Sequence, residues 1–376
     1  MPDYPSWQDV QNAKRNQAAT AAEIDRIEGI LVALENKAAE LGKIAQIKAE
    51  EYAVARDALA AATQKVERLT EKVDEANERA EESAKRAARL IAQLARTGGG
   101  DLTLGLIIGS AADTDELLAR LGSMNRLTES SSDILARAQF DQNLAESLSQ
   151  DAKAAEKVRK RLATEAEDAL AVAQAASDKA AAEVAEQKAH VDQMYAQLAS
   201  LKNTTASVEQ AYQEGLSEQQ ENQQNNPPPS GGGNPPGGVD PTPDPPVGSA
   251  VQQAINYAMA QVGEPYAFGG AGPGSWDCSG LTKMSYASAG VYIGTHSASN
   301  QYSTMSAQGR LVSVNALAAG DLLYYSNGGS TSGSKYHTAI YIGGGRMVEA
   351  PRPGVNVRVV SVRYGDLVPY AGRPTG

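Results

Sequence analysis

Cysteine, histidine, tryptophan and phenylalanine are scarce in this chain of 376 residues, which has one Cys, three His, two Trp and two Phe. A single cysteine excludes an intramolecular disulfide, so cysteine usage does not reveal the compartment. No run approaches the roughly 20 apolar residues that a membrane-spanning helix needs. Residues 1–5 lack the basic and apolar parts of a signal peptide, which leaves a cytosolic protein or a secreted chain whose signal was removed.

The charge is unevenly distributed along the chain, which carries a net charge of -11. From Ser249 onward there are eight Lys and Arg against five Asp and Glu, or +3, and the preceding residues have 26 against 40, or -14. No dense basic stripe occurs, which argues against nucleic-acid binding. The length and the uneven composition predict at least two modules.

Two seven-residue apolar steps dominate the first hundred residues. The step from Ile24 to Leu94 is apolar at all eleven positions, and the step from Ile27 to Leu90 at eight of ten. Because the two steps are offset by three residues, they predict a long coiled-coil helix over about residues 8–96. A second heptad pattern predicts a helix over residues 128–222. The glycines at 98–100 favour an antiparallel hairpin within one chain, and a parallel dimer is the alternative.

Residues 101–127 lie between the two predicted helices and form the most apolar stretch of the first half. They would occupy the tip of the hairpin. One interpretation is a small cap that buries its own apolar residues. The other is a docking surface for a partner, since the end of a hairpin has little chain of its own to cover such a patch.

Residues 223–248 contain nine of the seventeen prolines and predict a disordered linker. Beyond it, residues 249–376 lose the alanine heptads and are long enough for one independent α+β domain. The predicted helices cover residues 251–262 and 278–289, and the predicted strands cover residues 322–325, 337–342, 346–350 and 355–360.

The lone cysteine, Cys278, follows Asp277 at the start of a predicted helix. Asp is a favourable N-cap, and a helix N-terminus favours a thiolate and offers free N–H groups to an oxyanion. The glycines at 269, 270 and 272 would let the backbone approach a substrate closely. Taken alone, Cys278 fits a small buried side chain equally well.

His337 begins a predicted strand that the glycines at 343–345 connect to the next strand. If those three glycines are the hairpin loop, Ile342 faces Arg346, and Glu349 becomes a same-face diagonal neighbour of His337. A carboxylate beside the imidazole would fix its tautomer and stabilise the imidazolium.

Cys278, His337 and Glu349 together make the constellation of a thiol hydrolase. A metal site is the competing chemistry, but Cys278, His296 and His337 lack the short spacing of zinc ligands. We therefore expect neither a metal nor a cofactor.

Several strings of the C-terminal module resemble the NlpC/P60 family of cell-wall peptidases. In family order they are Pro265–Gly270, Asp277–Leu281, Gly320–Leu323 and His337–Ala350. The resemblance implies a papain-like α+β fold and a cysteine peptidase that cuts peptidoglycan stem peptides. The usual target is the bond between D-isoglutamate and the diamino acid, which is meso-diaminopimelate or lysine.

The resemblance also implies residue roles. Cys278 would be the nucleophile, His337 the general base and then acid, and Glu349 the orienting residue, a position that is often histidine in the family. His296 stands where many members have an arginine, so an arginine contact to a substrate carboxylate is not carried over. The candidate substrate and oxyanion residues are Tyr266, Asp277, Ser279, His296 and Ser297.

Residues 103–110 followed by 115–121 resemble the coiled-coil tip of division-associated peptidoglycan hydrolases, which an FtsE-FtsX type membrane ABC transporter engages. The whole arrangement resembles Rip-type endopeptidases of corynebacteria and mycobacteria. That likeness implies a secreted or cell-envelope protein that acts in cell division and daughter-cell separation, with its signal peptide removed.

The sequence thus favours a secreted endopeptidase whose coiled coil positions or restrains a tethered catalytic module. One alternative is a scaffold that activates another hydrolase and carries a silent C-terminal domain. A second alternative is a CHAP-like amidase. A further hypothesis is autoinhibition, in which the helices fold back over the cleft until a partner binds the tip.

Overall fold

The computed structural model describes residues 4–15, 17–96, 114–224 and 248–375. The chain divides into two compact units, one formed by residues 1–57 and 166–376 and the other by residues 58–165. The first unit therefore contains both the C-terminal module and the adjoining parts of the long helices. Most of the predicted linker and residues 101–113 of the predicted tip lie outside the described residues. No helix within the described ranges is long and apolar enough to cross a membrane.

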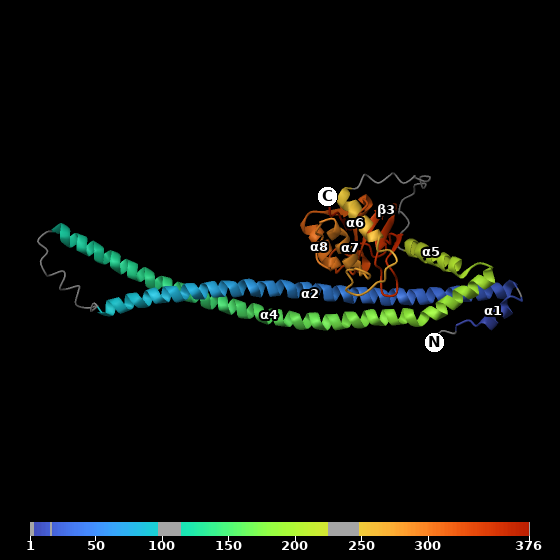
Figure 1. Ribbon diagram of the computed structural model, residues 1–376, viewed down its shortest axis with the longest axis horizontal. Helices are drawn as coiled ribbons and strands as arrows, with labels where there is room; N and C mark the ends of the chain where they lie inside the picture. Colours follow the sequence, from blue (N-terminus) through green and yellow to red (C-terminus); the bar gives the residue numbers. More distant parts are fainter. Residues whose placement is uncertain (1–3, 16, 97–113, 225–247, 376) are drawn as a thin grey trace. The chain divides into compact units, whose positions relative to one another are not determined.

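The helices before the C-terminal module are α1 (Trp7–Ala13), α2 (Gln17–Arg96), α4 (Thr114–Lys202) and α5 (Ala206–Gln224). In the first unit, α2 and α4 lie side by side and run antiparallel (Figure 1), since Lys37 pairs with Glu183 at 2.5 Å and Lys202 with Glu28 at 2.7 Å. The predicted antiparallel hairpin is confirmed. The apolar cluster at this end joins α1 to both helices and consists of Val10, Ala13, Ile27, Leu31, Leu34, Met194, Leu198 and Leu201.

The helix boundaries differ from the prediction at two places. The helix predicted over residues 8–96 is divided into α1 and α2, and the helix predicted over residues 128–222 starts at Thr114 and is interrupted after Lys202. Asn203 there has a φ of 57°, a left-handed conformation that Asn tolerates better than most residues. Val208 and Tyr212 continue the seven-residue apolar steps of Leu201 and Leu198 past this break, but both are exposed.

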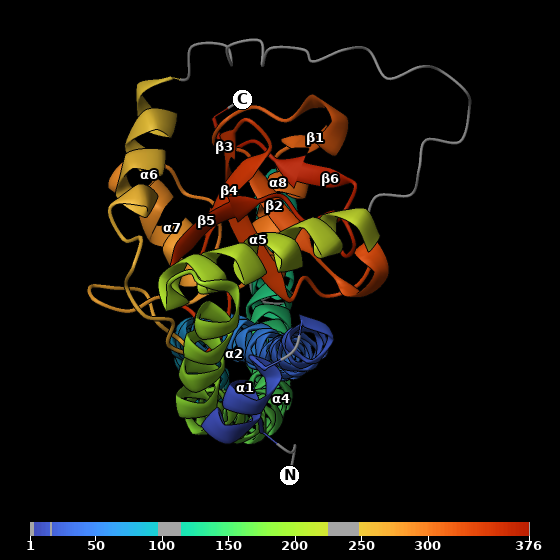
Figure 2. The same ribbon diagram turned by 90° about the vertical axis from the view of Figure 1, so that its right-hand side faces the viewer.

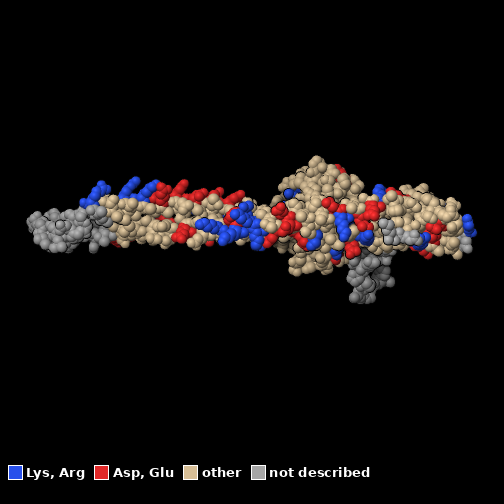
Figure 3. All heavy atoms as spheres, turned by 90° about the horizontal axis from the view of Figure 1, so that it is seen from below, with Lys and Arg blue, Asp and Glu red and all other residues tan. Residues whose placement is uncertain are grey.

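The second unit consists of the remaining parts of α2 and α4, residues 58–165. Its exposed faces carry ion pairs one turn apart, such as Lys85–Glu81 and Arg161–Glu165, and Figure 3 shows such charges gathered along the helices. Small side chains bury little apolar area, so each contact contributes little. Among the described residues of this unit, the buried apolar positions are all alanine, namely Ala76, Ala87, Ala145 and Ala155.

The C-terminal module packs three helices against a six-stranded antiparallel sheet of order β1-β6-β2-β3-β4-β5 (Figure 2). The helices are α6 (Ser249–Met259), α7 (Cys278–Ser288) and α8 (Ala298–Ala307), with 3₁₀ turns at Val314–Ala316 and Asn327–Gly329. The strands are β1 (Leu311–Ser313), β2 (Leu322–Tyr325), β3 (His337–Gly343), β4 (Arg346–Glu349), β5 (Arg358–Ser361) and β6 (Tyr370–Gly372).

Alternation along the strands divides the sheet between two apolar cores. Leu322 and Tyr324 of β2 pack with the helices and Trp276, whereas Leu323 and Tyr325 pack on the opposite face. The buried members of both cores come only from residues 251–371. The C-terminal module therefore has complete cores of its own.

The predicted strands are found with small shifts, and β5 begins at Arg358 rather than at residue 355. In the β3–β4 hairpin, Tyr341 faces Met347 as the glycine loop predicted, but Gly343 rather than Ile342 faces Arg346 because the strand has a bulge there. The sequence did not predict α8, β1 or β6. The two strands have three residues each, and α8 has few apolar residues, so none carries a strong period.

Candidate active site

Cys278 is the first residue of α7, next to its capping residue. Asp277 is the N-cap, as predicted, and its Oδ1 accepts hydrogen bonds from the Gly280 amide at 2.7 Å and the Ser279 hydroxyl at 3.2 Å. A Cβ on Gly280 would overlap the carbonyl oxygen of Gly270, so only glycine allows this close approach. The cap and the glycine contact hold the start of α7 at the floor of the cleft.

His337 begins β3, and Glu349 ends the neighbouring strand β4. Nε2 of His337 lies 2.7 Å from Oε2 of Glu349, and both residues are fully buried. Glu349 also accepts hydrogen bonds from Arg358 at 3.1 Å and from Arg363 at 2.7 and 2.8 Å. Burial alone would raise the pKa of Glu349, but Arg363, His337 and Arg358 hold it well below its ordinary value. Glu349 is therefore ionised at neutral pH.

The imidazole of His337 is neutral and carries its one N–H hydrogen on Nε2, the nitrogen that faces Glu349. Burial lowers the pKa of His337, although Glu349 acts in the opposite direction, so the ring is neutral at neutral pH. Its other nitrogen, Nδ1, lies 3.0 Å from Nε2 of Gln46, which also donates to the carbonyl of Pro351. Because an amide nitrogen only donates, Nδ1 accepts and Nε2 carries the hydrogen.

The Cys278 thiol is almost fully covered, with 8% of the residue exposed. Burial raises its pKa well above the ordinary value, and the Asp277 charge raises it further, while the backbone N–H groups of Thr338 and Ser279 act in the opposite direction. The predicted thiolate at the helix N-terminus is therefore wrong for this conformation, because burial outweighs the N–H groups. The thiol is neutral here.

Four of the five candidate substrate residues line the pocket of this thiol, namely Tyr266, Asp277, Ser279 and His296, and Ser297 does not line it. Nε2 of His296 lies 2.7 and 2.8 Å from the two carboxylate oxygens of Asp277. Ser297 caps α8 and accepts from the Asn300 amide at 3.0 Å. Among the described residues, no group of three or more His, Cys, Asp and Glu side chains could hold a metal ion.

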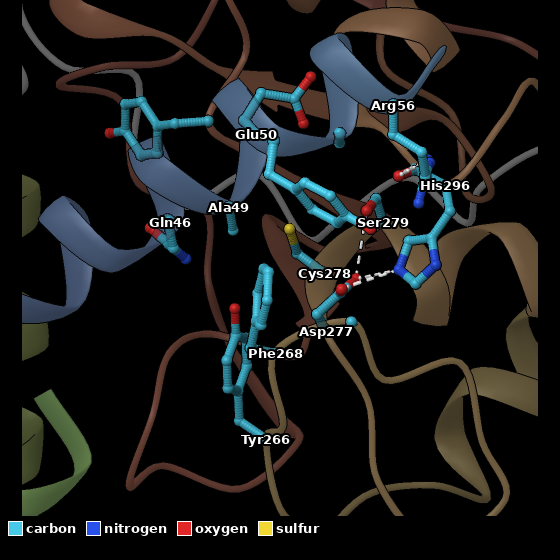
Figure 4. Close-up of a pocket in the computed structure, with 14 residues that line it drawn as sticks. Gln46, Ala49, Glu50, Arg56, Tyr266, Phe268, Asp277, Cys278, Ser279 and His296 are labelled. Carbon is cyan, nitrogen blue, oxygen red and sulfur yellow. Dashed lines mark hydrogen bonds and ion pairs between the residues drawn. The ribbon is translucent and has the colours of Figure 1, made fainter. Parts of the chain in front are cut away.

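The pocket above Cys278 has walls from two distant parts of the chain (Figure 4). The C-terminal module contributes Tyr266, Phe268, Gly269, Asp277, Cys278, Ser279, His296 and Tyr336. The helix α2 contributes Gln46, Ala49, Glu50, Tyr52, Ala53 and Arg56. The cleft is thus closed by residues 35–57 of α2, which we call the covering segment.

The covering segment contacts the module mainly through polar side chains near the thiol. Besides the contact of Gln46 with His337, Arg56 donates to the carbonyl of His296 at 2.8 Å, and Asp57 accepts from the hydroxyl of Thr295. The carboxylate of Glu50 accepts hydrogen bonds from the start of α8 at 2.7, 2.9 and 3.0 Å.

Two ion pairs extend this contact toward the start of α2. Lys43 pairs with Asp366 at 2.6 Å, and Glu35 pairs with Arg352 at 2.5 Å. Between them, Gly42 lies so close to Arg352 that a Cβ would stand 2.9 Å from the Arg352 Cβ and overlap its Cδ. Five of the contact residues recur at intervals of seven, four, four and seven and so lie on one face of the helix, namely Glu35, Gly42, Gln46, Glu50 and Asp57.

Sequence reasoning missed the partners of Glu349 and the contacts of the covering segment. Arg358 and Arg363 lie at and beyond the strand after Glu349, and no spacing rule singled them out. For Gln46 and Glu50, the available signal was Gly42, an otherwise unfavourable residue inside a long helix. A glycine followed by polar residues on its own face indicates close approach by another part of the protein.

The model of the NlpC/P60 family matches residues 263–367. These residues form an NlpC/P60 domain. The match includes Cys278, His337 and Glu349, and it leaves out the long helices. The predicted α+β fold of the module after a helical hairpin is confirmed, and the strings that suggested the family all reach into or lie within the matched range.

Several similar curated proteins come from mycobacteria. "Peptidoglycan endopeptidase RipA" of Mycobacterium tuberculosis is 35% identical over 137 residues, which cover 33% of this chain and 27% of the relative. A "probable endopeptidase" of the same organism is 40% identical over 106 residues, which cover 28% and 25%. The chain thus spans about a quarter of the length of these relatives.

The structure of the peptidoglycan hydrolase RipB from Mycobacterium tuberculosis is 32% identical. The match covers 33% of this chain and 64% of that chain, with a TM-score of 0.28.

Proposed function

We propose that this protein is a peptidoglycan endopeptidase that uses Cys278 as its nucleophile. The observation that carries the proposal is the buried His337–Glu349 pair on the strand that reaches Cys278, since the backbone N–H of Thr338, the residue after His337, contacts the Cys278 thiol. A neutral imidazole held by a permanent carboxylate is the arrangement that a thiol or hydroxyl nucleophile needs. The similarity to proteins named peptidoglycan endopeptidases supports the substrate class.

In the proposed reaction, His337 takes the thiol proton on Nδ1 while Nε2–H stays bonded to Glu349. The sulfur attacks the scissile carbonyl, and the free N–H groups at the start of α7 stabilise the oxyanion. The imidazolium then protonates the leaving amine, which departs and leaves a thioester. A water molecule, activated by the same imidazole, hydrolyses the thioester and restores the thiol.

We further propose that the bond cut is the one between D-isoglutamate and the diamino acid, preferably meso-diaminopimelate. The NlpC/P60 match supports this choice over a CHAP-like amidase. Tyr266, Asp277, Ser279, His296 and Ser297 would contact the substrate around the thiol. An extracellular or envelope location follows from such a substrate.

The structure also supports a closed, inhibited state. Gln46 donates to Nδ1 of His337, the atom that must take the thiol proton, and the covering segment excludes the stem peptide from the pocket. The charge of Glu50, which belongs to the same segment, also raises the pKa of Cys278. We propose that activity requires the covering segment to leave, as it could when a membrane ABC transporter of the FtsE-FtsX type binds residues 101–127.

The test is digestion of purified peptidoglycan by the full chain and by residues 249–376, each with and without Cys278→Ala. We expect the module to release soluble muropeptides, the full chain to release fewer, and the Cys278→Ala variants to release none. Mass spectrometry of the products identifies the bond. Equal release with and without the thiol, or no release from any form, would exclude the thiol mechanism and favour a scaffold with a silent domain.

Equal activity of the full chain and the module would exclude inhibition by the covering segment, while leaving the enzyme proposal intact.

A further inference from the structure

Two arginines hold the carboxylate of Glu349, and they hold it in unequal ways. Arg363 donates two hydrogen bonds, from Nη1 to Oε1 at 2.8 Å and from Nη2 to Oε2 at 2.7 Å. Arg358 donates one, from Nε to Oε1 at 3.1 Å. The Arg363 side chain is 23% exposed and that of Arg358 is 39% exposed. Because two parallel hydrogen bonds fix the orientation of a carboxylate as well as its charge, Arg363 constrains Glu349 more strongly than Arg358 does.

The carboxylate oxygen that orients the imidazole is one that Arg363 holds. Oε2 of Glu349 lies 2.7 Å from Nη2 of Arg363 and 2.7 Å from Nε2 of His337. A rotation of the carboxylate would move Oε2 away from the ring and would break both hydrogen bonds to the guanidinium. Arg363 thus opposes the one side-chain motion of Glu349 that would release His337.

Arg363 also contacts an aromatic residue that packs on the imidazole. The guanidinium carbon of Arg363 lies 5.2 Å from the centre of the Tyr325 ring, a distance at which a cation and an aromatic face attract each other. The centre of the Tyr325 ring in turn lies 5.4 Å from that of His337. Tyr325 belongs to β2 and is 2% exposed. Arg363 therefore acts on His337 by two routes, through Glu349 and through Tyr325.

The charge of Arg363 bears on the proton affinity of His337. Burial lowers the pKa of His337 most, Glu349 raises it, and Arg363 and then Arg358 lower it. Gln46, the residue of α2 that touches the ring, is uncharged. The titratable groups around the ring and its strand are Glu349 on β4, Arg358 on β5, Arg363 after β5, Tyr325 on β2 and Cys278 on α7.

We propose that Arg363 is a positioning residue of the peptidase, which holds the carboxylate of Glu349 against Nε2 of His337 and packs Tyr325 on the ring without touching the substrate. The reaction that it serves rests on the proposed function, whereas the positioning rests on the contacts of Arg363. Arg358 carries the same charge beside the same carboxylate but makes one hydrogen bond to it instead of two, so it provides the matched comparison.

The first test follows the imidazole by NMR titration of residues 249–376, which contain complete cores and two histidines, His296 and His337. We expect Arg363→Gln to move the midpoint of the His337 titration to higher pH, because a positive charge beside the ring is lost. Arg358→Gln should move it less. His296, which pairs with Asp277, is the internal control. An unchanged His337 midpoint in Arg363→Gln, or a larger change in Arg358→Gln, would overturn the proposal.

Cleavage of a stem peptide by the same module measures the consequence for the reaction. Arg363→Gln should lower kcat/KM at pH 7 about tenfold, the factor expected for the loss of one charge-assisted hydrogen bond. The acidic limb of its pH profile should move to higher pH, since the imidazole must be neutral to take the thiol proton. Arg363→Lys keeps the charge but cannot make the paired hydrogen bonds, so kcat should fall while the acidic limb stays in place. A loss confined to KM in either variant would contradict the positioning role.

A double-substitution cycle connects the effect to Glu349. In a module that already carries Glu349→Gln, Arg363→Gln should cost little further activity, because the carboxylate that it holds is gone. Equal losses in both backgrounds would show that Arg363 acts without Glu349 and would overturn the proposal. Where Arg363→Gln does not fold, Arg363→Lys and Arg358→Lys take its place. The first should then lower kcat more than the second, and equal losses would count against the proposal.

The titration and the cleavage assay fail separately in this design. A His337 titration that moves in Arg363→Gln, in a module that cleaves no stem peptide, would leave the positioning role standing and overturn the proposed enzyme. Cleavage by a module whose His337 titration ignores Arg363 would do the reverse.

Discussion

The C-terminal module and the contact that covers it are built from different interactions. The module is held by two apolar cores in which residues such as Trp276, Tyr324 and Leu323 are fully buried. The covering contact consists mainly of hydrogen bonds and ion pairs, and its pairs Lys43–Asp366 and Glu35–Arg352 reach solvent. Burial of apolar area is hard to reverse, whereas polar contacts exchange with water at little net cost. This difference is what the proposed function requires, namely a stable catalytic module and a covering segment that can leave it.

The largest effect on activity should come from a substitution inside the C-terminal module itself. Glu349→Gln removes the charge that orients His337 and leaves Arg358 and Arg363 without their carboxylate. We expect the rate of stem-peptide cleavage by the module to fall roughly 10²–10⁴-fold, as when a triad acid is neutralised. The free energy of unfolding should fall by about 3 kcal/mol, because one partner of a buried ion pair is lost. Steady-state kinetics and denaturant unfolding measure both, and a variant with normal activity would refute the orienting role.

The same buried pair should make the module sensitive to acid. The folded pKa values of His337 and Glu349 lie below their ordinary values of 6.5 and 4.5, so the unfolded chain takes up protons first as the pH falls. Stability from this pair is therefore complete above pH 6.5, declines below it, and declines further below 4.5. Thermal melts of the Cys278→Ala module from pH 7.5 to 4 measure the trend. A constant melting temperature across that range would contradict it.

Removing the contacts of Gln46 and Glu50 should weaken the binding of the covering segment to the module. Gln46→Ala with Glu50→Gln frees Nδ1 of His337 and removes the charge at the start of α8. Each lost hydrogen bond contributes about 1 kcal/mol, and a tenfold shift needs about 1.4 kcal/mol, so full-chain activity should rise roughly tenfold. Glu51→Gln is the matched control, since Glu51 is exposed and pairs with Lys48 on the same helix. Identical activity of the double variant and the control would show that these contacts do not hold the cover.

A steric change at Gly42 tests the contact between the covering segment and the module without altering any charge. Gly42→Ala would push against Arg352, whereas a Cβ at Gly29 of the same helix meets nothing within 4 Å. Both substitutions raise helix propensity by about 1 kcal/mol, so only the first combines this gain with a clash. We expect Gly42→Ala to raise full-chain activity a few-fold and Gly29→Ala to leave it unchanged. Equal behaviour of the two variants would remove Gly42 from the contact.

The parts of the site that the sequence predicted depend on local patterns. The Asp277 cap joins residues only three positions apart in the sequence. The position of Glu349 beside His337 follows from the alternation of side chains in two strands joined by a glycine turn. The contact of Gln46 with His337 joins residues 291 positions apart, and no local pattern encodes it. In the sequence, Gln46 resembles any solvent-facing residue of a coiled coil, because the heptad accounts only for the face that packs on α4.

The smallest effect on full-chain activity should come from the solvent-exposed ion pairs of the covering segment. Lys43→Met removes an ion pair with Asp366 in which the lysine side chain is 42% exposed, and exposed pairs contribute about 0–1 kcal/mol. Full-chain activity should therefore rise no more than about fivefold at low ionic strength, and the difference from wild type should shrink as salt is added. Lys48→Met, which removes a lysine paired only within α2, serves as the control. An increase as large as that of the Gln46 and Glu50 double variant would mean that the rim, rather than the cleft contacts, holds the cover closed.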